Sequence, residues 1–215
     1  MASVKEIEDE VREAAARGST LDNIIPSVVR RAHVWLERNY TFAYMKQLMS
    51  VVLPEDARCM PLPPRVKEIY WLRTSPKATG KEDKLRYLVR VDPIEISSAS
   101  LGIPSGWWLD SNEYIFFDAQ PGEDVPLQMY FSRYTAYPSD NTEKTWLTDN
   151  AEELLIAQSM LHLAPFMRDE TLVQFWQPRR DVELDAHYRR EEELERGGTS
   201  MKMGYVPPGL RLNQN

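Results

Sequence analysis

Hydrophobic positions recur with a helical period near the start of the chain. Residues 3–18 place an apolar side chain every three or four positions, and Ser3 and Glu6 have the spacing of a capping box. Residues 20–39 repeat the pattern, with Pro26 early enough to lie in a first helical turn. The spacing predicts two amphipathic helices.

The pattern changes after these helices. Residues 41–50, TFAYMKQLMS, are expected to continue as a turn or short helix. Residues 53–64 carry four prolines, a density through which no helix runs. The first helical part is therefore expected to stop near residue 53.

Residues 66–134 are rich in β-branched and aromatic side chains, interrupted by polar turn residues. Two hairpins are predicted, with long polar loops at residues 74–83 and at residues 118–124, where Pro121-Gly122 marks the turn. The four strands are expected at residues 66–73, 84–92, 112–117 and 125–131.

The strand at residues 112–117 is apolar on both faces. Tyr114 and Phe116 point to one side of it, and Ile115 and Phe117 point to the other. A single layer of four strands cannot cover both faces. The second face is therefore expected to meet another sheet layer, the helices or another chain.

The chain then becomes helical again. Residues 152–164 are apolar on nearly every side, which indicates a helix at the centre of a bundle. Asp149 and Glu152 are predicted as its capping box, and Pro165 is expected to end or kink it.

A last, long helix is predicted up to Gly197-Gly198. Asp169 is placed to cap it, and Pro178 is expected to kink it because proline removes a backbone hydrogen bond. The residues after these glycines include no acidic side chain and only scattered apolar ones, which predicts an extended arm rather than a core.

These elements predict an α+β fold: an antiparallel helical bundle of about four helices with a β-rich insertion and an extended C-terminal arm. Residues 1–50 and 146–197 are expected to form the two parts of the bundle. Residues 51–145 form the β-rich insertion, and residues 198–215 form the arm.

The composition of the chain limits the kinds of partner and the cellular compartment that can be expected. The 215 residues carry a formal net charge of −7, which argues against a broad basic surface for nucleic acid. The single cysteine, Cys59, excludes an internal disulfide framework and fits a reducing compartment. The N-terminus lacks the apolar core of a secretion signal, and no stretch is long and apolar enough to span a membrane. A soluble protein is expected.

Signatures of catalysis and of cofactor or metal binding are missing. Gly80-Lys81 is followed by Glu82 where a phosphate-binding loop needs Ser or Thr. Ser105 in GIPSG stands one position too late for a nucleophile elbow. Glu183 and His187 could bind a metal only with a third ligand from elsewhere, so an ordinary helix side-chain pair is the better interpretation.

Tryptophans near carboxylates leave one enzymatic alternative open. A sugar-binding cleft would combine aromatic platforms with paired carboxylates such as Asp110 and Glu113. The tryptophans concerned are Trp71, Trp107, Trp108 and Trp146. We expect these side chains to serve in the core and in subunit contacts rather than in a sugar-binding cleft. The chain is therefore predicted not to be an enzyme and to have no cofactor.

The order of elements resembles the head-to-tail adaptor, or connector, proteins of short-tailed and related bacteriophages. The likeness covers about residues 20–196. It lies in the aromatic WLERNYTFAYM, in LPEDAR, in the insertion GIPSGWWLDSNEYIFFDAQP followed by LQMYFSRYTAY, and in TWLTDNAEELLIAQSMLHLAPFMRDETLVQFW before a charged helix.

The resemblance implies a structural protein of the virion, made in the host cytoplasm, that forms a ring of about twelve copies in the neck or tail. Such a ring joins the portal to the next tail component, a nozzle or fibre protein, and lets DNA pass during ejection without sequence-specific binding. The residues expected to contact the tail or a neighbouring subunit are Trp107, Trp108, Tyr114, Phe116, Pro121 and Gly122.

The resemblance also implies that the C-terminal arm docks on the portal. The residues expected to do so are Met203, Tyr205, Pro207, Pro208, Leu210, Arg211 and Leu212. Two alternatives stay open: a tail-associated protein that binds or cleaves carbohydrate, and a helical regulatory module that dimerises through its helices.

Overall fold

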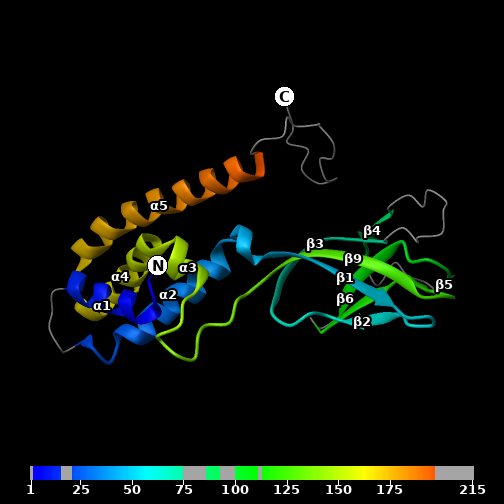
Figure 1. Ribbon diagram of the computed structural model, residues 1–215, viewed down its shortest axis with the longest axis horizontal. Helices are drawn as coiled ribbons and strands as arrows, with labels where there is room; N and C mark the ends of the chain where they lie inside the picture. Colours follow the sequence, from blue (N-terminus) through cyan, green and yellow to red (C-terminus); the bar gives the residue numbers. More distant parts are fainter. Residues whose placement is uncertain (1, 16–20, 75–85, 93–99, 111–112, 197–215) are drawn as a thin grey trace. The chain divides into compact units, whose positions relative to one another are not determined.

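The computed structural model describes residues 2–15, 21–74, 86–92, 100–110 and 113–196 (Figure 1). The chain divides into two compact units. The helical unit consists of Met1–His33 and Ser139–Asn215, and the sheet unit consists of Val34–Pro138. The first boundary falls inside a helix, so the end of that helix belongs to the sheet unit.

Five α-helices lie in the described residues. They are α1 (Val4–Ala15), α2 (Ile25–Asn39), α3 (Trp146–Asn150), α4 (Glu152–Met167) and α5 (Glu170–Arg196). Within the described part of the chain, none is long and apolar enough to cross a membrane.

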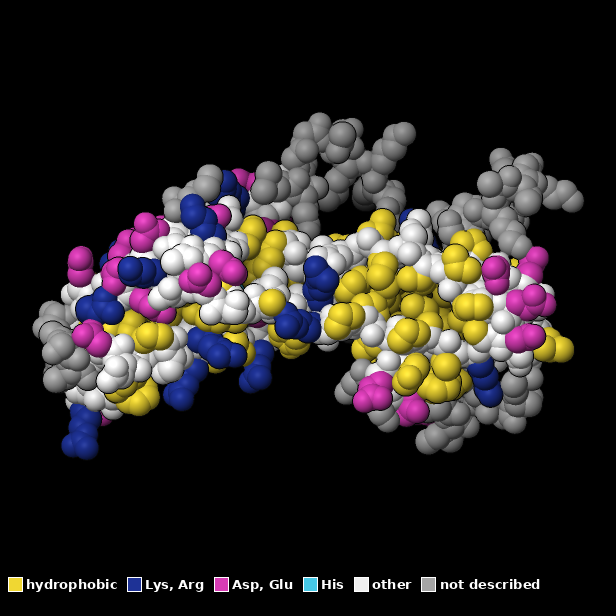
Figure 2. Space-filling view, turned by 60° about the horizontal axis from the view of Figure 1, so that its bottom comes forward, with side chains coloured by type: hydrophobic (Ala, Val, Ile, Leu, Met, Phe, Trp, Pro, Cys, Tyr) yellow, Lys and Arg dark blue, Asp and Glu magenta, His cyan; other side chains and the backbone are white. Residues whose placement is uncertain are grey.

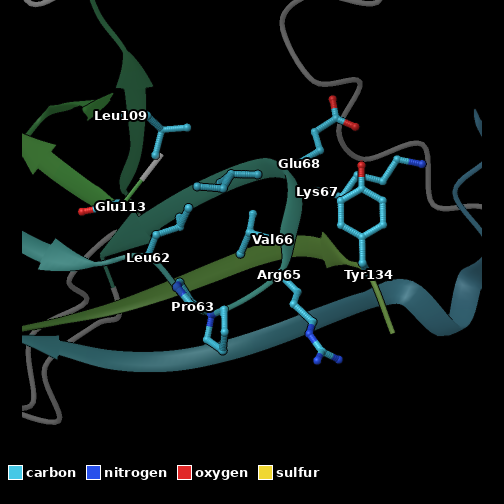
Figure 3. A pocket seen from close by; sticks show the side chains of 11 residues that line it. Leu62, Pro63, Arg65, Val66, Lys67, Glu68, Leu109, Glu113 and Tyr134 are labelled. Carbon is cyan, nitrogen blue, oxygen red and sulfur yellow. The ribbon is translucent and has the colours of Figure 1, made fainter. Parts of the chain in front are cut away.

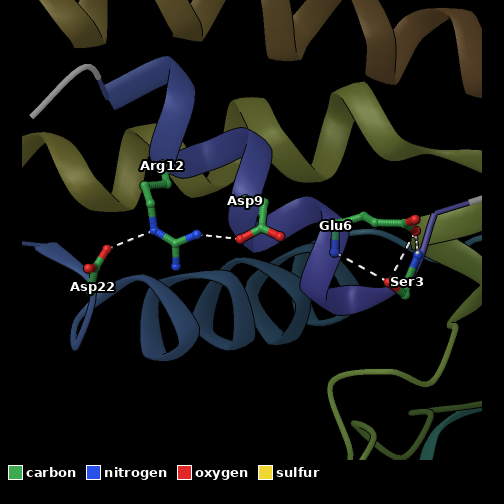
Figure 4. A network of polar contacts seen from close by, with 5 residues as sticks. All are labelled: Ser3, Glu6, Asp9, Arg12 and Asp22. Atoms are coloured by element: carbon green, nitrogen blue, oxygen red, sulfur yellow. Dashed lines mark hydrogen bonds and ion pairs between the residues drawn. The ribbon is translucent and has the colours of Figure 1, made fainter. Parts of the chain in front are cut away.

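The predicted capping box of α1 is confirmed (Figure 4). The Glu6 carboxylate accepts a hydrogen bond of 2.6 Å from the Ser3 backbone N–H, and the Glu6 N–H donates to the Ser3 hydroxyl at 3.3 Å. Farther along, Arg12 pairs with Asp9 and donates to Asp22 at 2.7 Å. These contacts hold the first turn of α1 and tie the helix to the segment that leads into α2.

Helix α4 belongs to the helical unit and is buried on nearly every side, as its sequence predicts. Every residue from Leu154 to Met160 is buried, including Gln158 and Ser159. The Ser159 hydroxyl donates to the Leu155 carbonyl at 2.7 Å, so this hydroxyl keeps a hydrogen bond when it is buried.

The ends of α4 differ from prediction. The capping box belongs to α3, where Thr145 and Thr148 bond reciprocally, and α4 follows Ala151 without a side-chain cap. The predicted Asp149–Glu152 box is therefore wrong. Pro165 does not end the helix, which continues to Met167 and stops where Arg168 adopts a left-handed φ of 51°.

The start of α5 agrees with prediction. The Asp169 carboxylate accepts from the Thr171 N–H at 3.0 Å, the geometry of a helix cap. Pro178 lies inside α5, which continues on both sides of it.

A carboxylate cluster near the start of α4 makes a testable contribution to stability. Burial, followed by the neighbouring carboxylates Glu152, Glu153 and Glu13, raises the pKa of Glu10. A raised acid pKa means that the folded state favours the protonated form. The folded state is therefore more stable when Glu10 is protonated. This gain in stability is fully present below the unfolded pKa and is lost as pH rises through the folded pKa.

We expect Glu10→Gln to raise the melting temperature at pH 7 and to have little effect below pH 4, where the carboxyl is protonated in both states. Glu10 is mostly exposed, so solvent screening limits the gain to about 0.5 kcal/mol. Glu55→Gln, at an exposed site in the sheet unit, is the control. Equal shifts for both variants, or a gain for Glu10→Gln that persists at acid pH, would contradict the role of the cluster.

The sheet unit contains a short 3-10 helix, Ala43–Met45, and nine strands in its described residues. The strands are β1 (Lys46–Leu53), β2 (Cys59–Pro61), β3 (Val66–Thr74), β4 (Arg86–Arg90), β5 (Ser100–Leu101), β6 (Gly106–Asp110), β7 (Tyr114–Phe117), β8 (Ala119–Gln120) and β9 (Val125–Arg133). Seven of them form one mixed, nearly closed sheet in the order β1-β9-β3-β4-β6-β7-β2.

The predicted fold, a bundle of about four helices with a β insertion, is wrong. The protein is α+β, but the nearly closed seven-stranded sheet dominates it and five helices accompany the sheet. One reason is β1, which occupies residues expected to form a turn or short helix. Its side chains alternate, with Leu48 and Val52 outside at 58% and 56% exposure and Met49 and Val51 packed against the core.

Strand pairing also departs from prediction. β3 and β4 form the expected antiparallel pair, with Leu72 opposite Leu88. The second predicted hairpin is wrong, because β7 pairs with β6 and β2 while β9 pairs with β1 and β3. β4 and β6 run parallel, which makes the sheet mixed.

The sheet curves so far that its own strands cover its inner face. The two sides of β7 separate as expected, with Ile115 and Phe117 completely buried and Tyr114 45% exposed. The inward residues of all seven strands meet in one core, so no second layer is needed. That core consists of Leu53, Met60, Leu72, Leu88, Trp107, Ile115, Phe117, Val125, Leu127, Met129 and Phe131.

Candidate functional site

Aromatic side chains gather on the outer side of β6 and β7. Trp108 lies opposite Phe116 in the register, and their rings stack with centroids 5.6 Å apart. Tyr114 meets Phe116 edge-on at 6.5 Å, and the Arg58 guanidinium lies 5.8 Å from the Trp108 ring centre. We call these four residues the β6–β7 face. Its composition of Trp, Tyr and Arg is typical of residues that dominate protein interfaces.

The structure brings together three of the six predicted contact residues: Trp108, Tyr114 and Phe116. Trp107 points the other way and is only 4% exposed in the core of the sheet unit. Pro121 is buried, and its carbonyl accepts from the Asp56 N–H at 2.9 Å. Gly122 is exposed, with open space where a Cβ would project.

Other predicted sites lie outside the described residues. This applies to the whole predicted portal-docking set, namely Met203, Tyr205, Pro207, Pro208, Leu210, Arg211 and Leu212. It applies as well to the polar loop at residues 75–83.

A second aromatic cluster, which sequence reasoning missed, spans β9, β3 and β4. The Tyr130 ring lies 5.3 Å from Tyr70 and 5.5 Å from Trp71, and Trp71 meets Tyr87 edge-on at 5.7 Å. Arg73 stacks over Trp71 at 4.6 Å. Three separate strands supply these rings, so only the register could have revealed the cluster. Figure 2 shows hydrophobic side chains gathered over the sheet unit.

A hollow of about 510 Å³ opens on the sheet unit beside the start of β3 (Figure 3). Leu62, Val66, Ile69 and Leu109 line it and also pack against the core. Glu113 lies at its edge, where its carbonyl accepts from the Leu62 N–H at 2.8 Å. The apolar wall of the hollow is thus continuous with the core of the sheet unit. The residues that line the hollow include no nucleophile paired with a general base.

The end of α2 is tied to the sheet by a polar network in the sheet unit. The Lys67 ammonium donates to the carbonyls of Glu37 at 2.6 Å and Tyr40 at 2.7 Å, which closes the C-terminal end of the helix. Burial lowers the pKa of Lys67 despite the nearby carboxylates of Glu68 and Glu37.

The Glu37 side chain anchors the other half of this network. Its carboxylate accepts from the Tyr44 hydroxyl at 2.9 Å and from the Thr135 N–H at 3.1 Å, and it also bonds to the Thr135 hydroxyl. Only 3% of Glu37 is exposed. These groups satisfy one another's hydrogen bonds and hold the end of α2 against the sheet.

The serine of GIPSG has a structural role. Asp118 accepts from the Ser105 hydroxyl at 2.6 Å and from the Ser105 N–H at 2.9 Å. Burial raises the pKa of Asp118, but these bonds and the Gly106 N–H outweigh it and hold that pKa below its usual value. A Cβ on Gly106 would lie 3.0 Å from Val91 and 3.2 Å from Asp118, which accounts for glycine there.

Metal and sugar sites are not assembled in the described residues. No group of His, Cys, Asp and Glu there could hold a metal ion. The His187 ring lies 6.0 Å from Trp146 in the helical unit, and burial lowers the pKa of His187. Trp71, Trp107 and Trp108 are divided among the second aromatic cluster, the core and the β6–β7 face, so they form no common platform.

No protein-family model matches the chain, and no curated protein matches it significantly. The functional assignment therefore depends on the residues and on the order of elements.

Proposed function

We propose that the protein is a structural component of a tailed bacteriophage virion, a head–tail adaptor that forms a ring between the portal and the tail. The observation that carries the proposal is the β6–β7 face, where Trp108, Tyr114 and Phe116 form an outward aromatic cluster with Arg58. Such a cluster suits a protein partner because large rings lose little conformational entropy on binding.

The order of elements supports the same proposal. Helices from both ends of the chain form one unit, and the segment between them forms a sheet unit. In a ring, each subunit presents different surfaces to its two neighbours, so the contacts are heterologous. The proposed ring has twelve copies, and its β6–β7 face contacts a neighbouring subunit or the next tail protein.

The net charge of the chain is compatible with a ring through which DNA passes. A formal net charge of −7 disfavours tight, sequence-independent adhesion to the phosphate backbone. DNA can then pass through the ring during ejection without being held. In this role the protein acts by assembly and needs no catalytic residue.

The test is reconstitution with the portal protein of the virus that encodes the chain. We expect electron microscopy to show a ring of the protein on the portal. In Trp108→Ala/Phe116→Ala, the ring or its attachment to the tail should be lost while the circular dichroism spectrum is unchanged. Val89→Ala is the matched control, since Val89 is a 65% exposed side chain on a central strand. Portal complexes without a ring of the intact protein would overturn the adaptor proposal.

A truncation separates the portal contact from the β6–β7 face. Removing residues 199–215 is expected to leave a folded protein that portal rings no longer retain in a pull-down. Undiminished retention would exclude the C-terminal arm and assign the contact to the helices.

A further inference from the structure

We infer that two copies of the free protein pair through the open edge of β1, which extends the sheet of one copy into that of the other. The inference does not rest on the proposed function. A pairing of this kind is isologous and joins two copies, whereas a ring needs heterologous contacts.

The edge is open along almost the whole strand. β1 stands at the end of the strand order and, among the residues that the structure describes, pairs only with β9, from Lys46 opposite Ser132 to Leu53 opposite Val125. In the described part of the chain, no other backbone hydrogen bond reaches residues 47–53. A row of backbone donors and acceptors is thus available to another strand.

The two ends of the sheet differ in how they are protected. β2 is only three residues long and includes Pro61, which cannot donate a ladder hydrogen bond. β1 has eight residues, no proline and no bulge in its register, and Lys46 at its start is its one charged residue. Edges that remain monomeric usually carry charges, prolines or bulges, so β1 has the character of a pairing strand.

The sequence of β1 is complementary to itself in the antiparallel direction. Directly opposite residues must share a face of the sheet, so a twofold axis has to pass beside a residue and not between two residues. With the axis at Ser50, the outward Leu48 lies opposite Val52 of the second copy. The resulting pairs are Gln47 with Leu53, Leu48 with Val52, Met49 with Val51, and Ser50 with Ser50.

This register brings no like charges opposite each other, and its one polar–apolar pair, Gln47 with Leu53, lies at the two ends of the ladder. Leu48 and Val52, exposed by 58% and 56%, cover each other across the axis. On the inner face, Met49 and Val51 are only partly buried and gain apolar neighbours. The Lys46 side chains lie at opposite ends of the two-stranded ladder, so like charges do not meet. These features favour a second copy as the occupant of the edge.

Single-cysteine variants test both the pairing and its register, in a Cys59→Ser background that removes the native thiol. Opposite residues in an antiparallel pair have Cα atoms about 4.5–5.5 Å apart, within the range that a disulfide spans. We expect Ser50→Cys to cross-link with itself under mild oxidation. Leu48→Cys mixed with Val52→Cys should give mainly the mixed dimer. Val89→Cys, at a 65% exposed site on a central strand, should form no cross-linked dimer, although the two copies still pair through β1.

A non-covalent measurement completes the test. Ser50→Lys places two ammonium groups opposite each other and should raise the dimer dissociation constant by about tenfold or more in sedimentation velocity. Ser50 is exposed, so the variant should remain folded. A monomer at micromolar concentrations of the parent protein would overturn the inference. So would equal cross-linking of Ser50→Cys and Val89→Cys, or Leu48→Cys cross-linking with itself as readily as with Val52→Cys.

Discussion

Replacing Glu37 by Ala should lower the free energy of unfolding of the sheet unit by about 2–4 kcal/mol. The Glu37 carboxylate is buried and accepts from the Tyr44 hydroxyl, the Thr135 N–H and the Thr135 hydroxyl. Alanine would leave these donors without their acceptor in a site with little access to water. Each unsatisfied buried donor costs about 1–3 kcal/mol, and partial rearrangement keeps the total below the sum.

Urea unfolding followed by tryptophan fluorescence measures this effect. Glu37→Gln keeps the size and one carbonyl acceptor, so it should cost about half as much. Glu55→Ala, at an exposed residue of the same unit, should change stability by less than about 0.5 kcal/mol. A loss of under about 1 kcal/mol for Glu37→Ala would mean that water replaces the carboxylate and that the network does not hold α2 to the sheet.

Local sequence patterns predicted the helices well because a helix is specified by residues three and four positions apart. The Ser3–Glu6 box and the Asp169 cap lie where the sequence placed them. The burial of α4 on nearly every side also follows from its composition. The failed cap at Asp149 has a local cause, since Thr145 and Thr148 form a competing box in the preceding turn.

Strand partners were poorly predicted because they depend on residues far apart in the chain. Residues 46–53, KQLMSVVL, carry apolar side chains at adjacent positions, so the sequence does not show the alternating exposure that the strand has in the structure. The segment also follows a helix and is too short to distinguish by period alone. Polar residues 118–124 suggested a hairpin, yet the strands on either side of them pair elsewhere. No local pattern identifies the parallel pairing of β4 with β6.

In the candidate site too, local patterns were predicted correctly and contacts between distant residues were not. A period of two correctly separated Tyr114 and Phe116 from Ile115 and Phe117. The pattern could not say which of the adjacent Trp107 and Trp108 faces the core, since both are large and apolar. The Glu37 network was inaccessible to sequence reasoning, because Glu37 and Thr135 are 98 positions apart.

The two faces of β7 allow the nearly closed sheet to be tested directly. Phe117→Ala should cost about 3–5 kcal/mol, because Phe117 is completely buried and its removal leaves a cavity between strands that cannot collapse freely. Tyr114→Ala, on the same strand but 45% exposed, should cost less than about 1 kcal/mol.

The same pair of variants separates folding from recognition. Tyr114 contributes to the β6–β7 face, so its loss should weaken attachment in the reconstitution experiment while unfolding in urea is nearly unchanged. Phe117→Ala should show the reverse: a large shift of the urea midpoint and, in the fraction that remains folded, unchanged attachment. If the two substitutions destabilised the protein equally, β7 would be covered on both faces. In that case the outer aromatic rings would belong to a second core and would not be available to a partner.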